Sequence, residues 1–203
     1  MNFYEIKNKL KNKSSITDNS YKRSSVIVLL TENENDIHIL FNQRSLKLKN
    51  QPGDICFPGG HQDENETSIE TVYREIFEEL GITKENIEII QKYENILTYG
   101  RGIITPFLGI LKNTKLENIK YNTDEVENIF TIPLSFFIEN EPQIYNIYYE
   151  PILSDNFPYH LIRNGKNYKF LKINSPQYFY IYNDVVIWGI TAKILKNIID
   201  IIK

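Results

Sequence analysis

The stretch GGHQDENETSIETVYREIFEELGI, residues 59–82, decides the fold. Thr67 is followed three residues later by Glu70, which is the pattern of a capping box at the start of a helix. Gly81 stands where a left-handed cap ends a helix. Apolar residues recur between them at helical spacing and predict a buried stripe: Ile69, Val72, Tyr73, Ile76, Phe77 and Leu80. The stretch therefore predicts a loop, a helix and a stop.

The other face of this helix carries Glu75, Glu78 and Glu79 at spacing i, i+3 and i+4, which brings the three carboxylates to one patch. Arg74 can reach Glu78 one turn further on and hold it. Carboxylates repel one another, and a hard divalent cation such as Mg²⁺ relieves the repulsion because it takes oxygen ligands. A solvated acidic face is the alternative. The glycine loop, the cap and the carboxylate spacing occur together, which favours a metal site.

A family resemblance rests on the same residues. Gly60, then Glu66 after five residues, then REIFEELGI at 74–82 after seven more, match every fixed position of the Nudix box. The chain therefore resembles Nudix hydrolases, which cleave a diphosphate linked to another moiety and use divalent metal. The resemblance implies an α/β/α sandwich with a mixed β-sheet, and it implies Mg²⁺ or Mn²⁺ as cofactor.

The resemblance also implies roles for residues of the loop and helix. Glu75 and Glu79 are expected to be the main metal ligands, and Glu78 a further ligand or a carboxylate that orients water. The backbone carbonyl of Gly59 is expected as an additional ligand. Arg74 is expected to contribute to catalysis by holding Glu78 in place, and Gly60 is expected to contact the substrate.

Residues 40–60, LFNQRSLKLKNQPGDICFPGG, resemble the segment that precedes the Nudix box in the coenzyme A pyrophosphatase group. The matching positions are Arg44, Ser45, Leu48, Gly53, Phe57, Pro58, Gly59 and Gly60. Asn42, Lys49 and Gln51 depart, since that group usually has Thr, Arg and His there. Lys49 keeps the charge but loses bidentate phosphate geometry. Gln51 keeps hydrogen bonding but cannot titrate. The departures leave the hydrolytic step intact and bear on substrate affinity.

Basic residues gather just before the expected metal site, at Arg44, Lys47 and Lys49. Coenzyme A carries a diphosphate and a 3′-phosphate, and a cationic cluster beside the metal suits such a polyanion. A solvated basic loop explains Lys47 and Lys49 about as well. Arg44 ends a predicted strand, which would position it. Arg44 and Lys49 are therefore expected to bind substrate.

Three later segments extend the resemblance. Residues 99–109, YGRGIITPFLG, carry Arg101 between two glycines. The Arg101 side chain is expected either to add a contact to a phosphate or to face solvent. Residues 122–134 carry Glu125, which is expected to help activate water or complete the metal shell, with a plain loop charge as the alternative. Residues 187–192 resemble the start of the group's C-terminal helix, whose expected buried stripe is Ile194, Leu195, Ile198, Ile199 and Ile202.

The remaining chain is expected to form one domain. Residues 1–22 are predicted to be a short amphipathic helix and linker, and residues 23–203 a single Nudix hydrolase domain. Residues 25–30 and 37–41 are predicted strands. The aromatic segment 136–182 predicts strands at 144–149 and 178–182. It also predicts a hairpin whose turn is Asn164-Gly165, between residues 159–163 and 168–171.

The net charge, the cysteine count and the lengths of the apolar runs indicate which classes of partner and which cell compartment to expect. The net charge of −3 gives no basic excess for nucleic acid. One cysteine, Cys56, excludes an internal disulfide and fits a reducing cytoplasm. No apolar run reaches transmembrane length, so no membrane is expected. The partner is expected to be a small diphosphate resembling coenzyme A, and a homodimer is left open.

The expected reaction is hydrolysis of the diphosphate of coenzyme A or a derivative, giving 4′-phosphopantetheine and adenosine 3′,5′-bisphosphate. One alternative keeps the chemistry and changes the substrate to ADP-ribose, a dinucleoside polyphosphate or a damaged nucleotide. Another is a Nudix-fold ligand sensor without turnover.

Overall fold

A computed structural model describes residues 2–10, 21–33, 36–98, 100 and 102–203. Near the N-terminus it contains helix α1 (Phe3–Leu10), as the apolar spacing predicted. In the described part of the chain, no helix is both long and apolar enough to cross a membrane.

The centre of the molecule is a mixed sheet. The strands are β1 (Arg23–Asn33), β2 (Asp36–Arg44), β3 (Ile55–Cys56), β4 (Gly59–His61), β5 (Ile87–Lys92), β6 (Ile96–Thr98), β7 (Gly102–Leu111) and β8 (Val126–Pro133). Their order is β3-β2-β1-β7-β5, with β4 paired to β1, β6 to β7 and β8 to β2. Strand β1 is parallel to β7, with Ile27 opposite Phe107, and antiparallel to β2, with Leu29 opposite Leu40.

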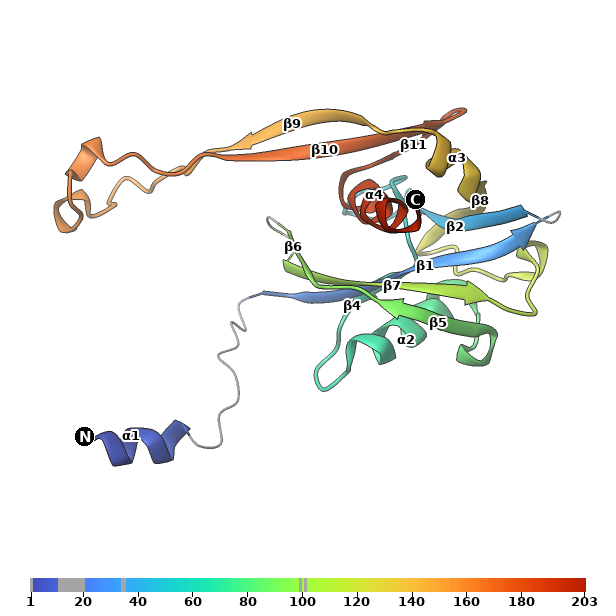
Figure 1. Cartoon of the computed structure of the whole chain (residues 1–203), viewed down its shortest axis with the longest axis horizontal. Coiled ribbons are helices and arrows are strands. Elements are labelled where there is room, and N and C mark those ends of the chain that lie inside the picture. The colour runs from blue at the N-terminus through green and yellow to red at the C-terminus, as the bar shows by residue number, and fades with distance from the viewer. Residues whose placement is uncertain (1, 11–20, 34–35, 99, 101) are drawn as a thin grey trace.

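Helices α2 (Ser68–Leu80) and α4 (Gly189–Ile202) cover opposite faces of this sheet (Figure 1). Side chains alternate between the faces along a strand. Ile27 and Leu29 of β1 pack in the cluster that includes Val72, Ile76 and Leu80 of α2. Val28 packs in the cluster on the α4 side, with Ile194, Leu195 and Ile198 and with Phe137 of the short helix α3 (Leu134–Glu139). The predicted α/β/α sandwich is confirmed.

Helix α2 begins and ends where the sequence predicted. The Thr67 hydroxyl accepts from the backbone N–H of Glu70, and the Glu70 carboxylate accepts from that of Thr67, which completes the capping box. Gly81 has φ of 65° and donates its N–H to the Phe77 carbonyl. The Phe77 side chain is 58% exposed, contrary to the prediction, because it lies at the margin of the apolar stripe.

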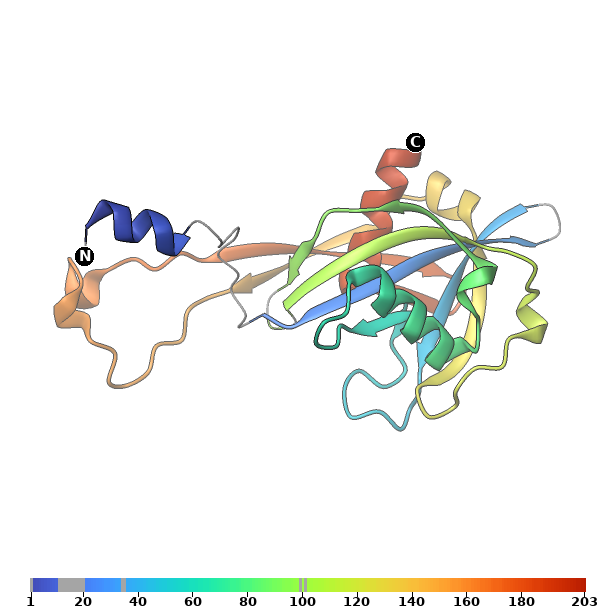
Figure 2. The same cartoon turned by 90° about the horizontal axis from the view of Figure 1, so that it is seen from below.

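A second, three-stranded sheet follows the core strands, with β9 (Gln143–Tyr149), β10 (Ile173–Tyr182) and β11 (Val185–Trp188) in the order β11-β10-β9. The two predicted strands in this region are confirmed. Strands β9 and β10 form a long ribbon that extends away from the body of the molecule (Figures 1 and 2). In α4 the predicted stripe is buried except Ile202, which is 41% exposed because the helix ends there.

The predicted hairpin at Asn164-Gly165 is wrong. Asn164 does adopt a left-handed conformation, with φ of 73°, but the residues around it form single 3₁₀ turns, η3 (Tyr159–Leu161) and η4 (Gly165–Asn167). Strand pairing instead ends further back, where Tyr149 lies opposite Ile173. The tip beyond it packs its own rings together, with contacts among Phe157, Tyr159, Tyr168 and Phe170. Two further 3₁₀ turns, η1 (Lys84–Asn86) and η2 (Leu116–Asn118), lie in core connections.

The tip of the ribbon is expected to be dispensable for folding. Neither hydrophobic core cluster includes a residue from 151–171. Glu150 and Lys172 form an ion pair of 2.6 Å across the ribbon, so an Asn-Gly turn in place of 151–171 can close the hairpin. We expect Tm to change by less than about 4 °C, measured by thermal unfolding. A fall of about 10 °C or more would show that the tip supports the core.

Candidate functional site

The α2 face of the sheet changes from apolar to polar toward one end. Strand alternation places Ser25 on the same face as Ile27, and Asn42 on the same face as Leu40. Both polar side chains are buried, with exposures of 0% and 1%. The carboxylate of Glu79, from α2, lies against this polar region and is 7% exposed. The sheet and the helix together therefore enclose one ionisable side chain.

The two oxygens of Glu79 differ in their contacts. Oε2 accepts from Asn42 Nδ2 at 3.1 Å and from the backbone N–H of Gly59 at 3.2 Å. Among the described residues, no donor contacts Oε1. Burial raises the pKa of Glu79 to about 8; the Gly59 hydrogen bond opposes that rise, and the negative charges of Glu75 and Glu125 add to it.

Arg74 connects the loop to the helix. Its Nε donates to Glu66 Oε1 at 2.7 Å and its Nη2 to Glu66 Oε2 at 3.1 Å, a bidentate pair. Nη1 donates to Glu75 at 3.0 Å and to Glu78 at 2.9 Å, and Nη2 also donates to the His61 carbonyl at 2.8 Å. The expected contact with Glu78 is present, but Arg74 hydrogen-bonds to three carboxylates rather than one and lies 3.8 Å from a fourth, Asp63.

Glu66 has a structural role that motif matching alone did not assign. The hydrogen bond from Arg74 is the main reason that the pKa of Glu66 falls to about 2. Thr71 Oγ1 also donates to Glu66, at 2.9 Å. The sequence did hold a signal for this pair, because Glu66 and Arg74 are both fixed positions of the Nudix box, eight residues apart. A loop that folds back on the start of the helix brings their side chains together.

The two glycines permit close approach of different groups. Gly59 has φ of 136°, and a Cβ there would lie 2.2 Å from the Ser25 carbonyl oxygen. A Cβ on Gly60 would lie 2.4 Å from the carboxyl carbon of Glu75. Gly59 therefore allows β4 to pair with β1, and Gly60 leaves room for the carboxylate of Glu75, which is half-buried.

Glu125 lies in an exposed turn before β8, and its backbone carbonyl accepts from the N–H of Ser45 at 2.9 Å. Its negative charge raises the pKa of both Glu75 and Glu79, although burial is the main cause of each rise. Glu125 therefore lies close enough to both carboxylates for its charge to act on them. Its part in activating water stays a prediction.

The expected substrate-binding cations are placed unevenly. Arg44 ends β2, donates to the Asn50 carbonyl at 3.4 and 3.3 Å, and lies near Cys56 and Glu79. Burial, the largest effect on Cys56, raises the pKa of its thiol to about 12. Lys49 is exposed. Arg101 lies outside the described residues.

The fit of a divalent cation can be judged from the donors. Within the described ranges, no group of three or more His, Cys, Asp or Glu side chains is arranged to hold a metal ion. Arg74 engages Glu75 and Glu78, while Glu79 keeps one free oxygen. The donors are oxygens, which suit Mg²⁺ or Mn²⁺, and a cation would relieve the repulsion that raises the pKa of Glu79. The chemistry of the donors therefore fits such an ion, and the assignment of these residues as ligands stays a prediction.

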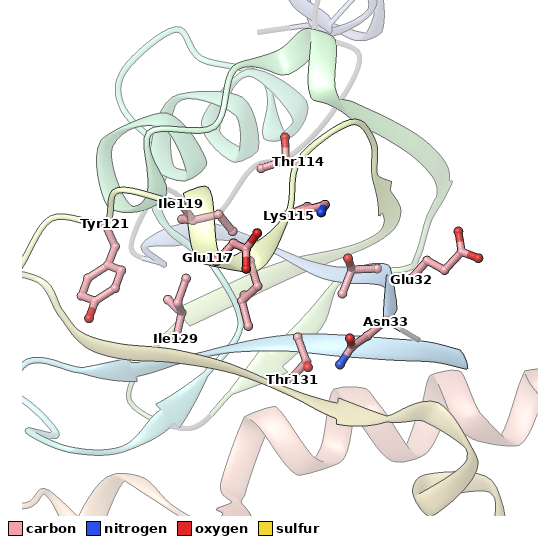
Figure 3. Close-up of a pocket in the computed structure, with 11 residues that line it drawn as sticks. Glu32, Asn33, Thr114, Lys115, Glu117, Ile119, Tyr121, Ile129 and Thr131 are labelled. Atoms are coloured by element: carbon pink, nitrogen blue, oxygen red, sulfur yellow. The ribbon is translucent and has the colours of Figure 1, made fainter. Parts of the chain in front are cut away.

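A separate hollow of about 720 Å³ lies away from these residues (Figure 3). Its lining includes Thr31, Glu32 and Asn33 at the far end of β1, and Lys115, Glu117 and Tyr121 from the segment around η2. None of the expected site residues lines it. Its size therefore carries no argument about the chemistry of the carboxylates.

Alanine is expected to affect activity at Gly60 and stability at Gly59. In Gly60→Ala the tip of Glu75 can turn away, so the protein should fold while the displaced carboxylate lowers the rate of any reaction at this site by about 10²-fold. In Gly59→Ala the clash is with backbone, and we expect destabilisation of more than about 3 kcal/mol. Thermal unfolding and initial rates measure both effects.

Gly100→Ala is the matched control for Gly59→Ala, because Gly100 also has a positive φ but, among the described residues, no atom lies within 4 Å of its added Cβ. It reports backbone strain alone. A Gly60→Ala protein with normal turnover would contradict the placement of Glu75 against this glycine.

Glu66→Gln is expected to change the pH dependence of stability. The folded pKa of about 2 lies below the ordinary 4.5, so the stabilisation is complete above about pH 4.5 and is lost as the pH falls toward 2. At pH 7 we expect the variant to lose about 1–3 kcal/mol of unfolding free energy. Urea unfolding across this pH range should show the gap between the two proteins closing in acid.

Glu88→Gln serves as the control for this titration, since Glu88 pairs with Lys112 on an exposed surface. Such a pair contributes about 0–1 kcal/mol. A gap between wild type and Glu66→Gln that stayed constant from pH 7 to pH 2 would mean that the Arg74 pair does not shift the titration of Glu66.

Comparison with known proteins identifies related chains. The NUDIX domain model matches residues 21–147. Nudix hydrolase 3 of Caenorhabditis elegans is 34% identical over 142 residues, which cover 64% of this chain and 59% of that protein. The peroxisomal coenzyme A diphosphatase NUDT7 of Mus musculus is 33% identical over 127 residues, which cover 62% of this chain and 52% of that protein.

The matched region spans only a little over half the length of these two relatives. Among solved structures, a C. elegans Ap4A hydrolase in a binary complex aligns with a TM-score of 0.48 and 23% identity, covering 55% of this chain and 80% of that one. The family model covers more than half of the chain, including β1, α2 and the Arg74 network. The chain belongs to the Nudix family.

Proposed function

We propose that the protein is a metal-dependent diphosphatase that hydrolyses coenzyme A or a close derivative. The observation that carries the proposal is the buried Glu79 carboxylate, which keeps Oε1 free while Glu75 and Glu125 lie near it. The likeness of residues 40–60 to the coenzyme A group supports the choice of substrate. So does the identity of 33% to a protein named as a coenzyme A diphosphatase.

Glu75 and Glu79 would hold Mg²⁺ or Mn²⁺, with Glu78 and the Gly59 carbonyl as further ligands. When bound, the ion would neutralise charge on the diphosphate and ease deprotonation of the attacking water. Arg74 fixes the loop and orients Glu75 and Glu78 through its hydrogen bonds. Glu125, on its exposed turn, would accept the proton from water.

The substrate would contact the cationic side of the site. Arg44 is fixed at the end of β2 and lies close enough to Glu79 to favour its charged form, so a phosphate beside the metal would be in its reach. Lys49 and Arg101 stay proposed as further substrate contacts. Water attack on phosphorus breaks the P–O–P bond and leaves 4′-phosphopantetheine and adenosine 3′,5′-bisphosphate.

Other features of the sequence analysis remain predictions. Residues 23–203 are proposed as one Nudix domain that follows the segment 1–22. A cytoplasmic location, the absence of nucleic-acid and membrane partners, and a homodimer also remain predictions; light scattering on the purified protein tests the last. A sensor without turnover has no need of the intact carboxylate set, which argues for the enzyme.

Product chromatography tests the substrate. Coenzyme A, its analogue without the 3′-phosphate, ADP-ribose and a diadenosine polyphosphate are incubated with Mg²⁺, Mn²⁺ or chelator. We expect metal-dependent release of adenosine 3′,5′-bisphosphate and a higher kcat/KM for coenzyme A than for the others. Equal kcat/KM without the 3′-phosphate would move the substrate to another nucleoside diphosphate. Ligand binding with no product from any compound would favour the sensor.

Glu79→Gln is expected to lower kcat by well over tenfold, because the amide cannot supply the charged oxygen that a divalent cation requires. Glu88→Gln removes a carboxylate from the exposed pair on β5 and should leave kcat unchanged. Initial rates at saturating substrate and metal measure both variants. Wild-type turnover in Glu79→Gln would refute the metal assignment.

A further inference from the structure

We infer that Asn42 is a positioning residue for Glu79: it fixes Oε2 so that Oε1 is presented to the metal. This inference rests on the proposed function, because it takes Glu79 as a metal ligand. Neither the Nudix box nor the motif before it assigns such a role to Asn42, which stands where the coenzyme A group usually has threonine.

The geometry of the contact supports this role. Asn42 Nδ2, from β2, and the Gly59 N–H, from β4, donate to the same carboxylate oxygen at 3.1 and 3.2 Å. Two donors from different strands restrict rotation of a side chain that would otherwise sample several rotamers. Since both bonds go to Oε2, the other oxygen remains available for a further ligand.

The surroundings of Asn42 argue against a role in stability alone. Its Oδ1 is buried and has no hydrogen-bond partner among the described residues, and the same holds for Ser25 Oγ. A buried acceptor without a partner costs about 1–3 kcal/mol. The neighbouring positions on this face, Ile27 and Leu40, are apolar. An amide here is therefore costly to the fold, and within the described ranges its side chain makes one hydrogen bond, to Glu79.

A leucine of similar shape separates the two roles. Asn42→Leu removes the donor and the unpaired acceptor together. If the amide has a purely structural role, the substitution affects only the stability of the fold and leaves the metal affinity unchanged. A positioning role predicts weaker metal binding whatever the stability. Thr191→Val is the matched control. Thr191 lies in α4, on the opposite side of the sheet, is also buried, and donates its hydroxyl to the Ile55 carbonyl.

Mn²⁺ binding without substrate provides the measurement, read from the electron paramagnetic resonance signal of free Mn²⁺. We expect the Kd for Mn²⁺ to rise about 10- to 100-fold in Asn42→Leu and to stay at the wild-type value in Thr191→Val. Asn42→Ala, which leaves a cavity in place of the amide, should show the same rise in Kd. It provides the test if the leucine variant does not fold.

A second readout comes from turnover of coenzyme A. The Mn²⁺ concentration for half-maximal activity should rise in Asn42→Leu, while kcat at saturating Mn²⁺ should change far less. A folded Asn42→Leu protein with the wild-type Kd would overturn the inference and leave the proposed function intact. A wild-type protein that bound no Mn²⁺ and hydrolysed nothing would overturn the proposed function, and this inference with it.

Discussion

The burial of the Glu79 carboxylate is the constraint on which the rest of the site depends. A charged group removed from water is costly unless donors or a cation compensate it. Here two N–H groups reach one oxygen, and they come from β2 and β4. Helix α2 must therefore lie over both strands in one register. The apolar stripe of α2 against Ile27 and Leu40 sets that register, so hydrophobic packing determines where the carboxylate lies.

The loop before α2 is held by a second set of interactions. Arg74 is the cation that balances Glu66, Glu75 and Glu78, and its bond to the His61 carbonyl connects it to β4. Gly60 lies directly against the carboxylate of Glu75, where a methyl group would not fit. The carboxylates of Glu66, Glu75, Glu78 and Glu79 are thus close together, with Arg74 and Arg44 as the nearby arginines, and this excess of negative charge favours the binding of a cation.

Much of this architecture could be predicted because its causes are local. The capping box at Thr67, the glycine at 81 and the apolar spacing between them are short-range signals, and helix α2 follows them. The strand alternation and the stripe of α4 are local as well. The Nudix box placed Glu75 and Glu79 on one helix at known spacing, so their proximity needed no tertiary information.

The remaining features depend on contacts between distant residues. The bond from Asn42 to Glu79 joins residues 37 apart, and no pattern within either segment indicates it. Asn164-Gly165 is a good hairpin signal, yet the flanking residues do not pair because the aromatic rings of the tip pack with one another. Phe77 is apolar but lies beyond the width of the buried face. In each case tertiary packing overrides the local preference.

Diffraction at the manganese absorption edge from crystals soaked in Mn²⁺ would test whether Glu79 and Glu75 are metal ligands. We expect an anomalous peak within coordination distance of Glu79 Oε1 and Glu75, with Arg74 still bound to Glu66. A peak elsewhere with Glu79 Oε1 unliganded, or a fully occupied site in which Glu75 did not contact the ion, would contradict it.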